Sequence, residues 1–251
     1  MKKLFTFFFL CSFFYALFSC DSENTNDCVK KPGKVIKREI QDIPTFDKIK
    51  IEGGIELILF QSTEQKVEIE TGENLINGIS LEVTDGELVI KNNISCNWFH
   101  NYNPVKAYIT FTDLTRIYSV SQYKIHSNQT LYFDVIELSS GVFGEGVATE
   151  FDLDIQCNHL SINANDASYL KISGNANSMW VAFWAGNPRI EAQHFQVNYI
   201  DFFQRSSNDM ILYPIEKIEG NIYSNGNVII KNAPPVIEVQ EHYSGKLVIS
   251  E

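Results

Sequence analysis

Short apolar-polar-apolar triplets recur along residues 153–230, and they constrain the fold more than any other feature of this sequence. The first four recur roughly every ten residues, and runs rich in asparagine, glycine and aspartate separate them. A strand of this length cannot bury its apolar side alone, whereas stacked neighbours build one continuous core. The pattern therefore predicts an all-β protein whose short strands stack into a solenoid.

The triplets also indicate which residues form the core and which form the corners. The apolar positions predicted to be buried are Ile155, Leu160, Ile162, Leu170, Ile172 and Val228. The asparagines predicted to stand at corners are Asn165, Asn175, Asn187, Asn198 and Asn208. Asparagine tolerates positive φ and can form hydrogen bonds along a stack, so we interpret these five as corner residues and not as ligands.

The region before the triplets predicts additional strands. Apolar and charged residues alternate at 49–51, 55–59 and 67–70, which is typical of half-buried strands. Residues 81–90 form the clearest hairpin pattern, because Asp85-Gly86 lies between two alternating runs and favours a type I′ turn. We expect this N-terminal strand and hairpin region to cover one end of the solenoid, which would otherwise expose unpaired backbone groups.

Residues 1–19 have the pattern of a bacterial signal peptide. Two lysines precede an apolar run that is too short to span a bilayer as a mature helix. The run ends in Leu-Phe-Ser-Cys20, which resembles a lipobox, so we expect cleavage before Cys20 and attachment of diacylglycerol to its sulfur. The alternative is an ordinary secretory peptide that is cut near Ser19.

The mature chain is predicted to consist of a flexible, lipidated tether at residues 20–39 and a folded domain at residues 40–251. The tether is polar, contains Pro-Gly and has no periodicity, so it cannot bury much apolar surface. Removing residues 1–19 takes away two of the 20 basic residues and none of the 31 acidic ones, so the formal net charge changes from −11 to −13. This balance excludes nucleic acid as a partner. The lipid is therefore the expected contact with the membrane.

Both ends of the domain resemble the head-GIN domain family. The resemblance rests on residues 46–57, Gln61 and residues 67–76, on the hairpin at 81–90, and on the closing segment at 222–235. It spans roughly residues 40–251. The resemblance implies a right-handed β-helix-like fold in a secreted or lipid-anchored bacterial protein, described as an auto-transporter adhesin without established activity. The family's repeated Ser-Gly-Ala-Ser units remain here only at 139–141 and 166–168.

The sequence contains no recognisable catalytic or metal-binding constellation. If Cys20 is lipidated, the remaining mature cysteines are Cys28, Cys96 and Cys157, so a Cys96–Cys157 disulfide is possible and free thiols are the alternative. The histidines show no metal-ligand spacing, and no catalytic motif is present. Acidic residues at 150–154 and 166 could support calcium or a lyase-type site, but a solvated acidic face is the simpler interpretation. We expect no cofactor and no metal.

Clustered aromatic residues are the main candidates for a ligand surface. Trp98 and Tyr102 lie in one segment, and Trp180 and Trp184 lie in another. Strand alternation places Trp180 on the face opposite Val181, so one large aromatic ring should be exposed there. Exposed rings offer apolar contacts to sugars or proteins, while an aromatic core or cap is the alternative.

These observations predict a non-enzymatic, lipid-anchored protein of the bacterial cell envelope, at the outer membrane and on its periplasmic or outer side. It would adhere to a glycan or a surface protein through one face of the solenoid. The alternative is a carbohydrate-active enzyme, of the polysaccharide lyase or hydrolase type, on a β-helix. Such an enzyme would need carboxylates and a base that converge in a groove.

Overall fold

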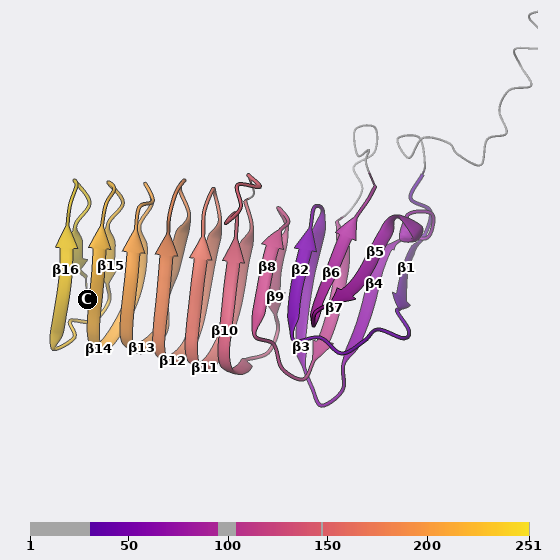
Figure 1. The fold of residues 1–251 in the computed structure, drawn as a ribbon, viewed down its shortest axis with the longest axis horizontal. Coiled ribbons are helices and arrows are strands. Elements are labelled where there is room, and N and C mark those ends of the chain that lie inside the picture. Colours follow the sequence, from indigo (N-terminus) through magenta and orange to yellow (C-terminus); the bar gives the residue numbers. More distant parts are fainter. Residues whose placement is uncertain (1–30, 95–103, 147, 251) are drawn as a thin grey trace, which may run out of the picture. The chain divides into compact units, whose positions relative to one another are not determined.

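The computed structural model describes residues 31–94, 104–146 and 148–250. Strands make up 63% of the protein, which is a β-solenoid of about six turns, so the predicted fold class is confirmed (Figure 1). From Pro32 onwards the described residues form one compact unit, except Ile94. Within the described ranges, no helix has the length and apolar character needed to cross a membrane.

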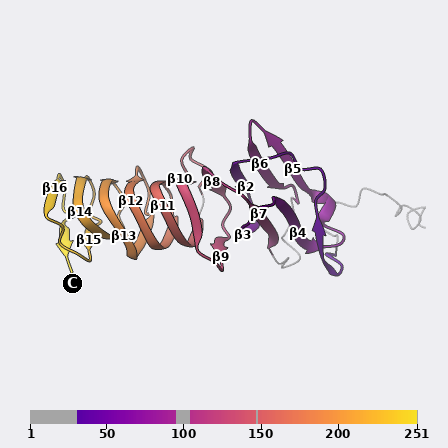
Figure 2. The ribbon, with the colours of Figure 1, turned by 90° about the horizontal axis from the view of Figure 1, so that it is seen from below.

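Five long strands form the central windings. They are β10 (Leu131–Ser140), β11 (Glu150–Ala164), β12 (Tyr169–Phe183), β13 (Arg189–Gln204) and β14 (Met210–Ile222). Each pairs in parallel with the next, and Figure 2 shows them as successive windings. Leu160 lies opposite Met179, which lies opposite Ile200, so one winding takes 19 to 21 residues here. The ten-residue recurrence is therefore half a winding.

The strands of the central windings are longer than the sequence pattern indicated. β11 to β14 have 13 to 16 residues instead of three to five, because two successive triplets belong to one strand that bends in its middle. Both halves of a bent strand can face the same interior, which lets a 20-residue winding close with a single turn. The pairing between β12 and β13 shifts its register between Lys171 and Ser173, close to the bend.

The solenoid thus has two long edges of different construction. The turn edge, at the top of Figure 1, consists of the turns that follow the long strands and β16, at residues 165–168, 184–188, 205–209, 223–227 and 242–246. The bend edge, at the bottom of Figure 1, consists of the middles of β11 to β14. Asn165, Asn187 and Asn208 lie at the turn edge, whereas Asn175 and Asn198 lie at the bend edge.

The predicted core residues all face the interior. Ile155, Leu160, Ile162, Leu170 and Val228 are fully buried, and Ile172 is 1% exposed. They belong to one continuous apolar cluster that runs through all the windings. The prediction is therefore confirmed, and the reason is that period-two alternation identifies the inward side of a strand whatever its partner.

Buried hydroxyl groups line the interior beside the turn edge. The side-chain oxygens of Ser119 and Thr149 are 3.1 Å apart, those of Thr149 and Ser140 are 3.0 Å apart, and those of Ser140 and Ser168 are 3.0 Å apart. All four residues are at most 1% exposed. The chain of hydrogen bonds satisfies these hydroxyls without water, and it connects the two segments that keep the family's serine-rich pattern.

The N-terminal windings do not follow the order of the chain. They consist of β2 (Lys48–Glu52), β3 (Ile55–Gln61), β6 (Glu87–Asn92), β7 (Val105–Phe111), β8 (Arg116–Val120) and β9 (Lys124–Ser127). β2 lies between β6 and β8, and β3 lies between β7 and β9, with every pair parallel. The first winding of the chain, β2 and β3, therefore lies in space between the winding of β6 and β7 and the winding of β8 and β9.

Antiparallel strands complete this end of the solenoid. β5 (Ile79–Thr84) pairs with β6, and β4 (Lys66–Gly72) pairs with β7; a short 3₁₀ turn at Ile76–Gly78 precedes β5. β5 and β6 are the predicted hairpin, and its turn residues Asp85 and Gly86 have φ of 51° and 76°, as a type I′ turn requires. Among the described strands β5 pairs only with β6, so it covers the last parallel strand on its side, as expected.

The folded domain begins earlier than the sequence indicated. Val35–Glu39, expected to belong to the tether at 20–39, forms β1, which pairs with β4 in antiparallel orientation. Lys37 forms an ion pair with Glu68 at 3.1 Å. A mostly exposed, charged edge strand has a composition close to that of a linker, and only the partner strand distinguishes the two. The predicted signal peptide, Cys20 and Cys28 lie outside the described residues.

The last windings use the shortest strands. β15 (Val228–Ile230) and β16 (Val236–Glu241) both pair with β14, one on each half of its length, and β17 (Leu247–Ile249) pairs with β15. Most residues of β16 are exposed. The parallel order therefore continues to the end of the described chain.

Candidate functional site

Five aromatic rings form a row along the turn edge, which we call the aromatic ladder: Trp180, Trp184, Phe203, Tyr223 and His242. Neighbouring ring centroids are 6.4, 4.6, 5.3 and 4.2 Å apart in this order. The ladder crosses the windings of β12, β13, β14 and β16. It is the largest group of contacting aromatic rings in the part of the chain that the structure describes.

The pairing of the windings explains why these rings meet. The first residues after β12, β13, β14 and β16 are 184, 205, 223 and 242. Backbone hydrogen bonds between neighbouring windings, such as Tyr223 N–H to Gln204 O at 2.7 Å, keep these positions side by side. Three of these four positions carry an aromatic ring, and the fourth carries Arg205. The ring of Phe203, two residues earlier, fills the space between Trp184 and Tyr223 instead.

Hydrogen bonds to asparagine side chains hold Trp184, near one end of the ladder, and His242, at the other end. The backbone N–H of Trp184 donates to Asn165 Oδ1 at 3.1 Å, and its indole Nε1–H donates to Asn163 Oδ1 at 3.4 Å. At the other end, Nε2 of His242 lies 2.8 Å from Asn221 Oδ1. The rings are thus ordered before any partner arrives, which lowers the entropy cost of binding.

The rings of the ladder are partly exposed and partly cover one another. Trp184 is 43% exposed and Tyr223 is 44% exposed, while Trp180 and Phe203 are half-buried. The interplanar angle is 29° between Trp184 and Phe203 and 3° between Tyr223 and His242, so neighbouring rings cover one another's faces. The surface is an apolar ridge and not a row of flat platforms.

Acidic residues border the ladder. Asp201 lies opposite Trp180 in the register of β12 and β13, and Glu219 and Glu238 follow on the next two strands. Lys217 forms ion pairs with Glu219 at 3.0 Å and Glu238 at 2.8 Å. Asp201 is different: partial burial and the charge of Glu219 raise the pKa of its carboxyl above the ordinary value of 3.8.

Half of the predicted ligand surface can be placed. The structure brings Trp180 and Trp184 together, and it buries Val181 and Phe183 on the opposite side, as alternation predicted. Trp98 and Tyr102 lie outside the described residues. The sequence also shows an aromatic cluster of Tyr199, Phe202 and Phe203, but the predicted ligand surface did not include Phe203. Tyr223 and His242 were missed, because the prediction used a ten-residue period; a period of 19 or 20 residues from Trp184 would have linked all three.

Cys157 is a half-buried free thiol in the middle of β11. Burial raises the pKa of this thiol to about 12, so the reactive thiolate is scarce at neutral pH. Cys96, its predicted disulfide partner, lies outside the described residues. The Cys96–Cys157 bond therefore stays a prediction.

Two of the acidic residues that could have supported calcium or lyase chemistry, Glu150 and Asp152, are engaged in ion pairs. Lys124 lies 3.3 Å from Glu150 and 2.6 Å from Asp152, and Lys171 lies 3.7 Å from Asp152. Although partial burial opposes ionisation of Asp152, these lysines lower its pKa. In the ranges that the structure describes, no three His, Cys, Asp or Glu side chains are arranged to hold a metal ion.

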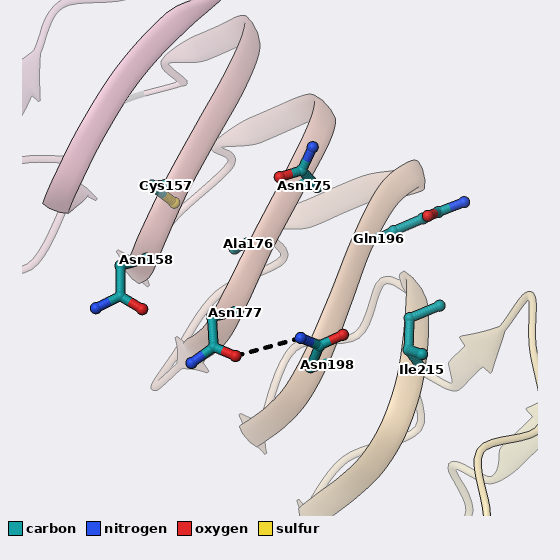
Figure 3. Close-up of a pocket in the computed structure, with 8 residues that line it drawn as sticks. All are labelled: Cys157, Asn158, Asn175, Ala176, Asn177, Gln196, Asn198 and Ile215. Carbon is teal, nitrogen blue, oxygen red and sulfur yellow. Dashed lines mark hydrogen bonds between the residues drawn. The ribbon is translucent and has the colours of Figure 1, made fainter.

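A second surface feature lies at the bend edge. It is a shallow groove of about 590 Å³, which we call the amide groove, and Figure 3 shows its lining. The lining residues come from four successive strands: Cys157, Asn158, Asn175, Ala176, Asn177, Gln196, Asn198 and Ile215. Five of the eight carry an amide side chain and none carries a charge.

The fold defines a β-solenoid protein. The chain belongs to the family described as "Putative auto-transporter adhesin, head GIN domain", whose sequence pattern matches residues 45–234. This confirms the resemblance seen in the sequence. No curated protein matches the chain.

Solved structures share the fold at low sequence identity. A protein from Bacteroides fragilis described as a "putative adhesin" superposes with a TM-score of 0.78 at 20% identity, covering 86% of this chain and 97% of its own. A protein from Parabacteroides distasonis titled "Putative lipid binding protein" has a TM-score of 0.65 at 19% identity, with 87% and 98% covered. An adhesin-titled protein from Parabacteroides merdae has a TM-score of 0.57 at 17% identity, with 87% and 97% covered. Family membership supports an adhesin-like, non-enzymatic role in an extracellular or cell-surface bacterial protein.

Proposed function

We propose that this protein is a non-enzymatic adhesin of the bacterial cell envelope, anchored by a lipid on Cys20, whose aromatic ladder binds a partner at the cell surface. The observation that carries the proposal is the ladder itself, a fixed and exposed apolar ridge across four windings. Family membership supports the adhesin-like role.

The anchor is proposed from the sequence at residues 1–20. A charged start, an apolar run and Leu-Phe-Ser-Cys20 are the signals for lipid attachment after export. Buried acyl chains contribute about 0.8 kcal/mol per methylene, so several chains on one cysteine give a stable anchor. We place the protein at the outer membrane, with the solenoid held away from the bilayer by the residues that follow Cys20.

The first test of the proposal is acylation at Cys20. Cells that express the full-length protein and are fed a radioactive or alkyne-labelled palmitate should yield a labelled protein band. The Cys20→Ala variant should give the same protein without label, while Cys28→Ala, which leaves the lipobox intact, should keep it. A labelled Cys20→Ala variant, or an intact signal peptide in the purified wild type, would contradict the anchor.

A protein partner fits the ladder better than a sugar does. Sugars stack on exposed ring faces, but in the ladder the faces of Phe203 and Tyr223 are covered on both sides by other rings. Ring edges contribute apolar area to a rigid surface, and aromatic residues of this kind dominate protein–protein binding energies. Many anchored copies on one cell would add avidity to a weak single contact.

The second test is the loss of adherence when ladder rings are removed. Trp184→Ala and Tyr223→Ala should fold, because both side chains are more than 40% exposed, and each should weaken adherence to host or bacterial surface protein about tenfold. The measurement is binding of the full-length protein to immobilised surface-protein fractions by surface plasmon resonance, with folding checked by circular dichroism.

Tyr132→Ala is the matched control, because Tyr132 is 57% exposed on β10 and lies outside the ladder. Equal adherence of the wild type and both ladder variants would refute the ladder as a binding surface. Turnover of a polysaccharide by the purified protein would contradict the non-enzymatic assignment and favour a carbohydrate-active enzyme.

A further inference from the structure

The amide groove at the bend edge is a second binding surface, and we propose that it binds a neutral glycan whose sugar units follow the axis of the solenoid. Five amide side chains line it, together with an apolar floor (Figure 3). The inference is independent of the ladder, which lies at the opposite edge of the windings and has its own proposed partner.

The parallel register arranges the amides in two rows. Asn175 lies opposite Gln196, which forms the first row. The second row lies two residues further along each strand. It consists of Asn158 of β11, Asn177 of β12 and Asn198 of β13. In Figure 3 the two rows point to opposite sides of the strands, with Cys157 and Ala176 between them.

The floor between the rows is apolar and uncharged. Ala176 is buried, and the thiol of Cys157 stays protonated because burial raises its pKa to about 12. Because the side chains of Cys157 and Ala176 are small, they leave open the space of the groove, and the larger amide side chains line its two sides. The groove therefore combines polar rims with an apolar base, as binding sites for small polar molecules commonly do.

The amide side chains of the groove form no hydrogen bond with the backbone of the described residues, unlike the asparagines of the turn edge. Asn208 Nδ2 donates to the backbone oxygen of Asn187 at 2.6 Å, and Asn165 Oδ1 accepts from two backbone N–H groups. At the bend edge, Asn177 Oδ1 accepts from Asn198 Nδ2 at 3.2 Å.

The other three amides of the groove, Asn158, Asn175 and Gln196, form no side-chain hydrogen bond with any residue that the structure describes. Asn175, expected from the sequence to be only a corner residue, is thus available to a ligand, whereas Asn198 already donates to Asn177.

The chemistry of the groove selects the class of ligand. An amide side chain offers two donors and one acceptor, which matches the neighbouring hydroxyl groups of a sugar, each both donor and acceptor. No lining residue carries a charge that would pair with an anionic or cationic group. Adjacent strands repeat about every 4.8 Å, which is close to the length of one pyranose unit in a chain. Successive amides can therefore contact successive sugars.

The groove is tested by glycan binding of the full-length protein and its amide variants. The probes are immobilised linear oligomers of glucose, mannose and galactose, with uronic acid oligomers as anionic counterparts, followed by isothermal titration calorimetry of the strongest binder. The wild type should bind a neutral oligomer more tightly than its anionic counterpart. The Asn177→Ala/Asn198→Ala double variant should bind it about tenfold or more weakly.

Asn177→Asp is the second variant, since it keeps the size of the side chain and the acceptor for Asn198 but removes both donors. It should also bind more weakly while keeping the thermal midpoint of the wild type. Asn128→Ala, which removes an exposed amide next to β9, should bind like the wild type.

Three results would overturn the proposal: no binding of the wild type to any neutral oligomer, unchanged affinity of the two groove variants, or loss of glycan binding in Trp184→Ala alone. The last result would assign glycans to the ladder. Loss of adherence to protein in the ladder variants does not bear on the groove, so the two functions fail separately.

Discussion

The Leu170→Ala variant is expected to unfold at a much lower denaturant concentration than the wild type, with a loss of about 2–5 kcal/mol in the free energy of unfolding. Leu170 is fully buried in a central winding, where it lies between Phe151 of β11 and Ile190 of β13 in the parallel register. Its truncation leaves a cavity that two windings share. Because these neighbours are themselves fully buried in the stack, the cavity cannot collapse without disturbing the pairing.

Such a loss is a large part of the free energy of unfolding, which is about 5–15 kcal/mol for a typical domain. Ile172→Ala, on the same side of β12, should behave similarly. Lys171→Ala is the matched control between them: its side chain is 57% exposed and its ion pair with Asp152 is a surface contact, so it should change stability by less than about 1 kcal/mol. Unchanged denaturant midpoints in both core variants would show that the register of the windings is wrong.

The Gly174→Ala variant is expected to be destabilised by about 2–5 kcal/mol, although it adds only one methyl group. Gly174 has φ of 109°, a conformation that residues with a side chain rarely adopt. The new Cβ would also lie 2.1 Å from the backbone oxygen of Ile155 on the neighbouring strand. The strand cannot move away without losing its parallel pairing to β11. Equilibrium unfolding in urea, followed by far-ultraviolet circular dichroism, measures the effect.

The Gly144→Ala variant separates the cost of the positive φ from the cost of the steric clash. Gly144 has φ of 80°, but a Cβ there would have no other atom within 4 Å, so only the conformational cost of about 1–2 kcal/mol should appear. If Gly174→Ala cost no more than Gly144→Ala, the close approach of β11 and β12 at this point would be refuted.

Residue alternation and turn composition were enough to predict much of the fold. Residues such as Leu160 and Ile162 were identified as core because side chains of a strand alternate between its two faces whatever strand lies beside it. The Asp85-Gly86 turn was identified for a similarly local reason, since few residues adopt positive φ at two successive positions. The edge strand at Val35–Glu39 was missed, because its exposed and charged residues carry no local sign of a partner.

The candidate sites were predicted less completely than the core. Trp180 and Trp184 were found because they lie close together in the sequence and alternate with buried residues. Phe203, Tyr223 and His242 join them only because one winding takes 18 to 21 residues at these positions, which brings distant residues into ring contact. Likewise, Asn165 and Asn175 look alike in the sequence, yet one holds a turn and the other lines a groove.

The sequence by itself therefore determined the local properties of this protein: strands, inward side chains and turns. These depend on residues that are within a few positions of one another. Only the tertiary structure decided how strands pair, and with it the length of a winding, the position of β2 between β6 and β8, and the composition of the ladder and the groove. The physical reason is that an inward-facing apolar side chain can pack against many similar neighbours, so local alternation does not specify which strands pair. The register of the strands depends on how all the windings close and stack together.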